Sequence, residues 1–182
     1  MKVLRFKKII SVSCSIASIL LFTASAYAYS VNINNVIPQE QQQTFWCWAA
    51  TSSMAANYLG VSSATQSNIV TAAFGSPYNV TGTVNDMKRG LAAYGITSTA
   101  LNTSIAFNTI VSNIDSRSNV ITTIKQSNGN GHALLIKGYY SDVQNLYYVD
   151  PADASSNVMA YSTYKSNSNW NWIDSLTSIA KN

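Results

Sequence analysis

The stretch Phe45-Trp46-Cys47-Trp48-Ala49-Ala50 lies at the start of a segment, residues 46–59, that contains no Gly or Pro. Apolar and small residues recur at helical spacing through this segment, and Gly60 follows it as a left-handed cap. The pattern predicts a helix with Cys47 at or near its first residue. The partial positive charge at a helix N-terminus favours a thiolate over a thiol, so this position suits a nucleophilic cysteine.

Two later residues would complete a site around Cys47. His132, the only histidine of the chain, follows a Gly-rich turn at the start of a predicted strand. An imidazole within hydrogen-bond reach of a thiol can act as its base. Asp150 ends the next predicted strand, and adjacent antiparallel strands would bring its carboxylate beside the imidazole to hold the ring's orientation. Asp153 is the substitute if Asp150 does not take this place.

A tetrahedral intermediate also needs hydrogen-bond donors for its negative oxygen. Gln41 stands six positions before Cys47 and offers a side-chain N–H beside the backbone N–H of that residue. Because residues 41–43 are all glutamine and Gln39 is near, Gln42 or Gln39 could take this place instead. Each candidate residue also has a purely structural interpretation. Cys47 could be a buried small residue, His132 a core histidine, Asp150 a turn former before Pro151, and Gln41 a surface residue of the loop.

The pattern along the chain predicts one α+β domain with a helical first half and a strand-rich second half. Ahead of the nucleophile helix, residues 31–38 form an extended lead-in and residues 39–44 a polar loop. Further helices are predicted at 65–74, 84–94 and 104–115, and antiparallel strands at 120–125, 133–140, 146–150 and 158–164. An amphipathic segment at 170–179 completes the domain.

The first 28 residues have the organisation of a cleaved signal peptide. Basic residues within 1–8 precede an apolar stretch at 9–22, and Ala26-Tyr27-Ala28 supplies a small-x-small cleavage site. The apolar stretch is shorter than the roughly 20 residues that a membrane-spanning helix needs, so no stable membrane anchor is expected. We therefore expect a secreted or periplasmic protein of residues 29–182. Cys14 leaves with the signal, and the one remaining thiol, Cys47, has no internal disulfide partner.

Charge and composition exclude several classes of partner. Four of the eleven Lys and Arg residues lie in the first eight positions and all seven acids lie after residue 28, so residues 29–182 carry no net charge. Without a basic cluster to neutralise phosphates, no nucleic-acid partner is expected. One Cys and one His cannot form a structural zinc site, and no Asp-rich calcium loop is present, so neither metal nor cofactor is expected. We expect a monomer.

The residues around Gln41 and Cys47 resemble the nucleophile segment of papain-like cysteine peptidases. With Gly131-His132-Ala133-Leu134-Leu135-Ile136-Lys137-Gly138-Tyr139 and Tyr147-Tyr148-Val149-Asp150-Pro151, the chain is similar to the compact bacterial branch related to the bacteriocin-leader (double-glycine) peptidases. The resemblance covers residues 37–164. It implies a papain-like two-lobed fold with a helical N-terminal lobe, which contains the nucleophile helix, and an antiparallel β-sheet C-terminal lobe.

The same resemblance implies a role for each candidate residue in the cleft between the lobes. Cys47 would be the nucleophile, His132 the general acid and base, Asp150 the orienting residue and Gln41 the oxyanion donor. The reaction would be hydrolysis of a protein or peptide substrate through a thioester acyl-enzyme. Residues 29–38 are too few for an inhibitory propeptide, so export, narrow substrate choice or a separate inhibitor protein would restrain the activity.

Cys-His chemistry on this fold also serves other reactions. A transglutaminase-like acyl transferase or a peptidoglycan amidase would use the same groups, because a fold and a triad do not set the substrate. A module that binds a peptide or glycan without turning it over is the alternative outside enzymes. A reactive thiol favours an enzyme, since a binding module does not require one.

Overall fold

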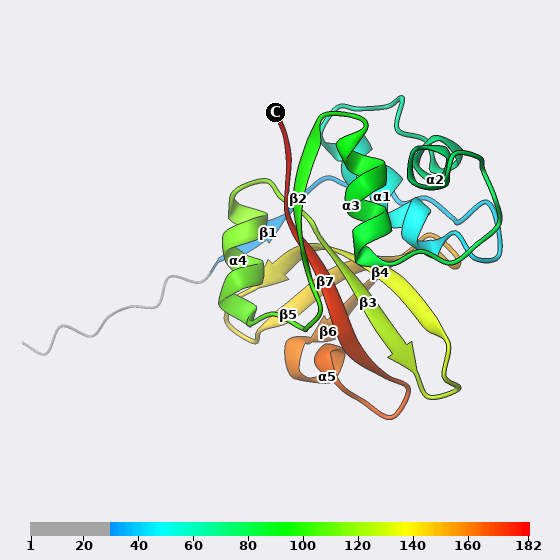
Figure 1. The fold of residues 1–182 in the computed structure, drawn as a ribbon. Helices are drawn as coiled ribbons and strands as arrows, with labels where there is room; N and C mark the ends of the chain where they lie inside the picture. The colour runs from blue at the N-terminus through cyan, green and yellow to red at the C-terminus, as the bar shows by residue number, and fades with distance from the viewer. Residues whose placement is uncertain (1–29) are drawn as a thin grey trace, which may run out of the picture.

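The computed structural model describes residues 30–182, so the expected signal peptide lies outside the described residues. The helices are α1 (Cys47–Tyr58), α2 (Gln66–Phe74), α3 (Val84–Ala92), α4 (Phe107–Asp115) and α5 (Tyr161–Lys165). The strands are β1 (Val31–Ile33), β2 (Ile96–Leu101), β3 (Val120–Gln126), β4 (Gly131–Tyr140), β5 (Asn145–Asp150), β6 (Ser155–Ala160) and β7 (Trp170–Lys181). Three helices thus precede most of the sheet, as Figure 1 shows, and the predicted α+β class is confirmed.

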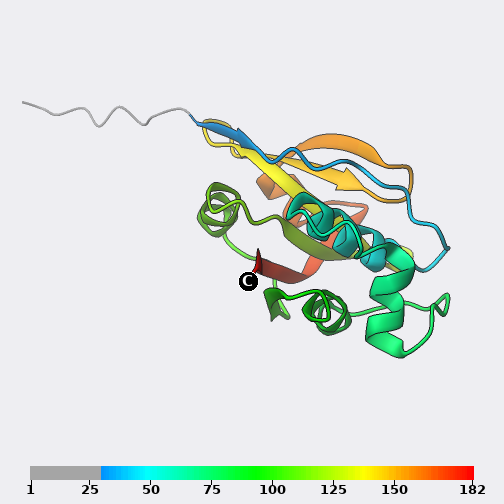
Figure 2. The same cartoon turned by 90° about the horizontal axis from the view of Figure 1, so that it is seen from above.

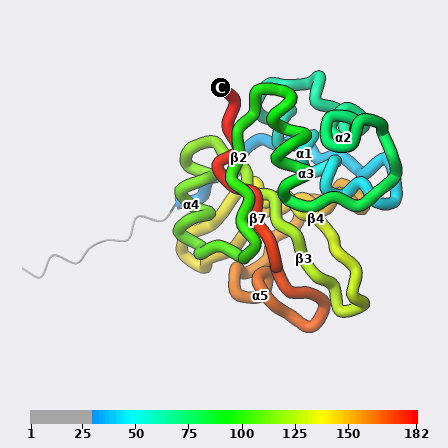
Figure 3. Tube along the Cα trace, in the orientation of Figure 1, coloured from blue at the N-terminus to red at the C-terminus, as the bar shows by residue number. Residues whose placement is uncertain are grey.

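The strands form one sheet in which every pair of neighbours is antiparallel. Their order is β2-β7-β3-β4-β5-β6, and β1 pairs with the end of β4. The C-terminal strand β7 therefore lies between β2 and β3, a placement that the tube in Figure 3 makes easy to follow. Strands β3, β4 and β5 are consecutive in the chain and adjacent in the sheet, so short turns join the strands that contain His132 and Asp150.

Each face of the sheet has its own hydrophobic core, because side chains alternate between faces along a strand. Ile121 and Leu135 pack with helices α1 to α3 on one face, whereas Ile124 and Leu134 pack with α4 and α5 on the other. Figures 1 and 2 both show α4 set apart from the group formed by α1, α2 and α3. The group of three helices is the predicted helical lobe.

Helix α1 is buried along most of its length. Ala49, Ala50, Ala55 and Ala56 are fully buried, and these small side chains, which are spread around the helix, let α1 pack closely against β4, α2 and α3. At its first turn, the indole N–H of Trp48 donates to the Val80 carbonyl at 3.0 Å. The indole N–H of Trp46, the residue before the helix, donates to the Tyr78 carbonyl at 2.8 Å. The two tryptophans therefore hold the start of α1, and with it Cys47, against the loop that precedes α3.

The prediction of a strand at 158–164 was wrong in its second half. Strand β6 ends at Ala160, and the chain continues as the short helix α5. The turn into α5 buries Tyr164 completely, between the rings of Tyr148 and Trp172, and places its hydroxyl 2.7 Å from that of Thr122. Burial of this aromatic side chain favours the helix over continued pairing in the sheet.

Two further differences from the sequence prediction concern β2 and β7. Strand β2 was not predicted, since its sequence of alternating Thr and Ser with few large apolar residues gives a weak strand pattern. The amphipathic segment at 170–179 forms β7, which pairs with β3 on one side and with β2 on the other, and each of these pairings includes a register shift.

None of the helices within residues 30–182 combines the length and apolarity required to span a membrane.

Gly82→Ala is expected to destabilise the protein, because an added Cβ would lie 2.5 Å from the ring of Trp48. That ring is 1% exposed and cannot move away without losing its hydrogen bond to Val80. Overpacking of this kind costs about 1–3 kcal/mol and should lower the urea midpoint at constant slope. Gly131→Ala is the matched control, since its Cβ would meet no atom within 4 Å. Equal midpoints for the two variants would contradict this account of the packing.

Candidate active site

Cys47 is the first residue of α1, as predicted, and is partly exposed. The N–H groups in the first turn of a helix have no intrahelical acceptor and carry a partial positive charge. The hydroxyl of Thr51 donates to the Cys47 carbonyl at 3.0 Å, which adds a side-chain contact to the first turn. The sulfur is thus placed at a positively polarised helix end that faces the sheet.

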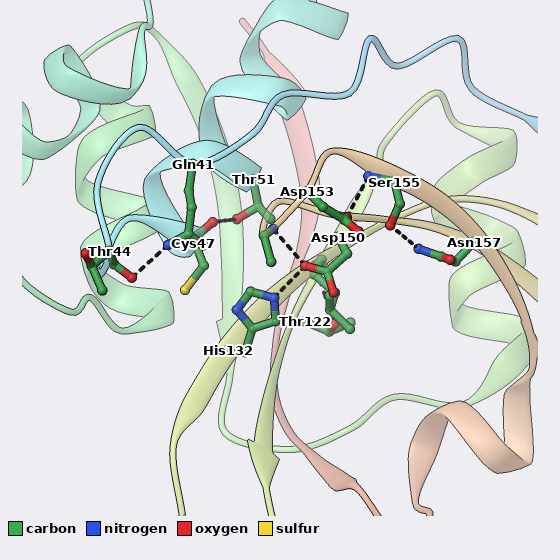
Figure 4. A network of polar contacts seen from close by, with 12 residues as sticks. Gln41, Thr44, Cys47, Thr51, Thr122, His132, Asp150, Asp153, Ser155 and Asn157 are labelled. Carbon is green, nitrogen blue, oxygen red and sulfur yellow. Dashed lines mark hydrogen bonds and ion pairs between the residues drawn. The ribbon is translucent and has the colours of Figure 1, made fainter.

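His132 and Asp150 form a direct pair across β4 and β5. The distance from His132 Nε2 to Asp150 Oδ1 is 2.7 Å, and the side chains are 14% and 31% exposed. The same carboxylate oxygen accepts the backbone N–H of Ala152 at 2.9 Å. Figure 4 shows the other side of the imidazole turned toward the Cys47 sulfur. The three side chains are therefore in line, with the ring in the middle.

Burial and charge act in opposite directions on His132. Burial of the ring disfavours the charged form and lowers its pKa, but the hydrogen bond to Asp150, the neighbouring Cys47 sulfur and the negative charges of both groups together outweigh the effect of burial. The pKa of His132 rises from 6.5 to about 9. The imidazole therefore carries a proton through neutral pH, which suits a ring that stabilises a thiolate and later gives a proton away.

Gln41 lies in the loop before α1, close to Cys47 in Figure 4. Its backbone N–H donates to the Pro151 carbonyl at 2.8 Å and so joins this loop to the segment after Asp150. Its side-chain Nε2 donates to the carbonyls of Gln43 and Thr44 at 2.9 and 2.7 Å. These two bonds orient the amide beside the thiol, and donation to an oxyanion would exchange one of them.

The alternative glutamines lie differently. The side chain of Gln39 accepts a hydrogen bond from Ser53 on α1 at 3.2 Å, so it turns to the body of the helix. Gln42 borders the same cavity as Gln41 and is exposed. Asp153, the alternative to Asp150, accepts the Ser155 N–H at 2.9 Å, and its pKa is lowered by its hydrogen bonds to Ser155. The structure thus brings Asp150 to His132 and leaves Asp153 in a turn.

A cavity of about 570 Å³ opens over these residues. Cys47, His132, Asp150 and Gln41 all line it, together with Phe45 and the neighbouring loop residues. A smaller cavity of about 250 Å³ adjoins the same cysteine and histidine, with Trp48, Met87 and Ala133 in its walls. The four predicted residues, which span 110 positions of the sequence, therefore share one cleft between the helices and the sheet. Within residues 30–182 no group of three or more His, Cys, Asp or Glu side chains is placed to hold a metal ion.

The sequence model of the family described as papain-like cysteine protease AvrRpt2 matches residues 30–169 of the chain. The chain belongs to this family. It is therefore a papain-like cysteine peptidase, and peptidases of this kind act on protein or peptide substrates. A comparison with curated proteins gave no match.

Solved structures show the same fold at low sequence identity. The peptidase domain of Streptococcus ComA, a bi-functional ABC transporter of a quorum-sensing pathway, superposes with a TM-score of 0.63 at 15% identity, over 81% of this chain and 99% of that domain. A double-glycine-motif protease from an AMS/PCAT transporter, solved with its leader peptide, gives 0.51 at 12% identity, over 80% and 94% of the two chains. The predicted resemblance to double-glycine peptidases is confirmed at the level of the fold.

Sequence reasoning missed several groups that support the site of this peptidase. The hydrogen bond from the Ala152 N–H to the Asp150 carboxylate could have been predicted locally, since an Asp side chain often accepts the N–H two residues later in an Asx turn. The Asn79 side chain accepts the Phe45 N–H at 3.0 Å and helps to join the nucleophile segment to the loop before α3. No pattern near Asn79 marks it, because its partner is 34 positions away.

The single histidine of the peptidase allows a direct test of its charge. In protein made without a histidine tag, the imidazole proton resonance of His132 should titrate with a midpoint of about 9, well above the ordinary value of 6.5. Asp150→Asn removes the charge and the acceptor that raise the pKa while burial remains, so the midpoint should fall by at least about one unit. Asp153→Asn is the control and should leave it unchanged. A midpoint near 6.5 in the unmodified protein, or a larger shift with Asp153→Asn, would overturn this assignment.

Proposed function

We propose that this peptidase is a secreted enzyme that hydrolyses peptide bonds through a Cys47–His132–Asp150 triad and a thioester acyl-enzyme. The observation that carries the proposal is the alignment of the three groups at the cleft. Asp150 lies 2.7 Å from one nitrogen of the His132 ring, and the other side of the ring meets the thiol at the head of α1. Such an arrangement serves nucleophilic catalysis, whereas a binding module does not need a thiol aligned with a base.

Acylation begins with the thiolate of Cys47. The sulfur attacks the carbonyl carbon of the scissile bond, a C–S bond forms, and the carbonyl oxygen becomes an oxyanion. The imidazolium of His132 gives its proton to the leaving nitrogen as the C–N bond breaks, and the amine product departs. Asp150 keeps the ring in the required orientation and stabilises its charge. The acyl group then remains on Cys47 as a thioester.

Deacylation uses the same groups in reverse. The now neutral imidazole takes a proton from a water molecule as the oxygen of that water attacks the thioester carbon. The second oxyanion collapses, the C–S bond breaks, and the carboxylic acid product leaves. Cys47 returns as a thiolate beside a protonated His132, which is the charge state that the raised pKa of the imidazole favours.

Two donors are available for the oxyanion in both steps. The backbone N–H of Cys47, at the first residue of α1, has no acceptor within the helix. The side-chain amide of Gln41 is the second, and it reaches the oxyanion by giving up one of its carbonyl acceptors in the loop. Donors of this kind contribute because they are already oriented when the negative charge develops.

Secretion is proposed on the sequence of the first 28 residues. The basic start, the apolar stretch and Ala26-Tyr27-Ala28 support export and cleavage before Tyr29. The first strand, β1, begins at Val31, so the proposed cleavage would leave the whole described fold intact. An exported enzyme with one cysteine also avoids disulfide exchange within its own chain.

The purified protein should cleave peptides in a proteome-derived peptide library, read by mass spectrometry of the new termini. Cys47→Ala should abolish cleavage, and His132→Ala should lower kcat/KM on a fluorogenic peptide built from a cleaved site by at least about a thousandfold. Iodoacetamide should label Cys47 rapidly at pH 6, where an ordinary thiol is protonated, and slowly in His132→Ala.

The control is Asp153→Asn, which should keep the activity because its side chain lies in a turn. Slow labelling of Cys47 in both the unmodified protein and His132→Ala would show an inert thiol and exclude the proposed mechanism. Rapid labelling with acyl transfer to added amines in place of hydrolysis would instead indicate a transferase.

Export can be tested by expressing the full chain in a bacterium with a general secretion pathway. The mass of the exported protein should correspond to a chain that begins at Tyr29. Ala28→Arg should block processing, because the cleavage site needs a small residue there. Retention of the uncleaved chain in the cytoplasm of cells that express the unmodified protein would contradict the prediction.

A further inference from the structure

We propose that Gln66 is a positioning residue for the oxyanion donor Gln41. It is the first residue of α2 and lies outside the residues that line either cavity at the cysteine. Its side-chain amide holds the loop before α1 by two hydrogen bonds, one to each residue that flanks Gln41. This inference rests on the proposed function, since it concerns the oxyanion donor of that mechanism.

The two bonds use both ends of the amide. Gln66 Nε2 donates to the Glu40 carbonyl at 2.8 Å, and Gln66 Oε1 accepts the Gln42 N–H at 2.9 Å. The side chain thus pairs with the loop as the edge of another strand would, although the loop belongs to no sheet. A charged or shorter side chain cannot make both bonds, because one needs a donor and the other an acceptor at the same reach.

Gln41 itself is fixed from the opposite side. Its N–H donates to the Pro151 carbonyl at 2.8 Å, next to Asp150. Three successive residues of the loop therefore have one backbone group each held by a partner distant in sequence. The residue at the centre is the one whose amide lies beside Cys47 in Figure 4. This arrangement selects Gln41 from the glutamines of the loop.

The placement of Gln66 is itself rigid. It is 2% exposed, and α2 starts there because the Thr65 hydroxyl caps the helix by accepting the Asn68 N–H at 3.3 Å. A buried amide that lost its partners would be costly, so the loop and the side chain hold each other in one geometry. Glutamine side chains usually lie at the protein surface, so the burial of Gln66 beside an exposed loop indicates a role other than filling the core.

Loss of this clamp should affect the chemical step more than the thiol. Removal of the two bonds frees the backbone around Gln41 and displaces the oxyanion donor, and small displacements of such groups can cost about a hundredfold in rate. The hydrogen bonds of the Gln66 side chain go to Gln42 and Glu40 and not to Cys47 or His132, so formation of the thiolate should continue. Turnover and alkylation therefore separate the two effects, because alkylation by iodoacetamide forms no oxyanion.

The test compares Gln66→Met with the unmodified protein on the fluorogenic peptide. We expect kcat to fall roughly 10- to 100-fold, KM to change little, and the rate and pH dependence of Cys47 alkylation to remain within about twofold. In a Gln41→Ala background, Gln66→Met should lower kcat by less than about twofold, because its effect acts through Gln41. Gln66→Glu, which keeps an acceptor for Gln42, serves as the second variant if Gln66→Met does not fold.

Asn113→Leu is the matched control. Asn113 is also a buried amide with two backbone partners, since it donates to Thr109 at 2.8 Å and accepts from Ser178 at 2.7 Å, but it lies on α4, with the core on the opposite face of the sheet. The Asn113→Leu variant should keep the kcat of the unmodified protein. Four results would each overturn the role of Gln66. The first two are an unchanged kcat in Gln66→Met and parallel losses of turnover and of the alkylation rate in that variant. The other two are additive losses of kcat when Gln66→Met is combined with Gln41→Ala and an equal loss of kcat in Asn113→Leu. An unmodified protein with no turnover would instead refute the proposed function.

Discussion

The close packing of α1 against β4 is the constraint on which the rest of the structure depends. Fully buried alanines around α1 let the helix lie close to the sheet and to α2 and α3, and this packing puts the first residue of α1 near the start of β4. Because Cys47 heads the helix and His132 is the second residue of the strand, one packing contact creates the thiol–imidazole pair. A larger side chain where α1 meets β4 would separate the two groups.

Loops complete what the packing begins. The tryptophans on either side of Cys47 anchor its segment to the carbonyls of Tyr78 and Val80, and Gln41 bonds to Pro151 across the cleft. Gln66 adds two further bonds from α2. Hydrogen bonds therefore hold the loops that border the cleft, while the two hydrophobic cores lie on the faces of the sheet behind it. Rigid support of this kind is what a preorganised site requires.

Local pattern predicted much of this arrangement, and it failed where distant contacts decided the conformation. Helical spacing and Gly60 located α1, and the change to β-branched runs located β3, β4 and β5. Strand β2 was missed because its edge position leaves little apolar pattern. The residues of α5 have the local pattern of a strand. They form a helix because the burial of Tyr164 against Tyr148 and Trp172, which come from other strands, outweighs local propensity.

The sequence by itself identified the groups of the candidate active site: a thiol at a predicted helix start, the one imidazole of the chain, and an Asp-Pro step at the end of the following strand. These signals are local, since helix start, residue type and strand end depend on near neighbours. Only the tertiary structure decided that Asp150 and not Asp153 meets His132, that Gln41 is the glutamine held beside Cys47, and that Gln66 supports it. Those choices depend on the course of loops and on hydrogen bonds between distant residues, which no run of neighbouring amino acids encodes.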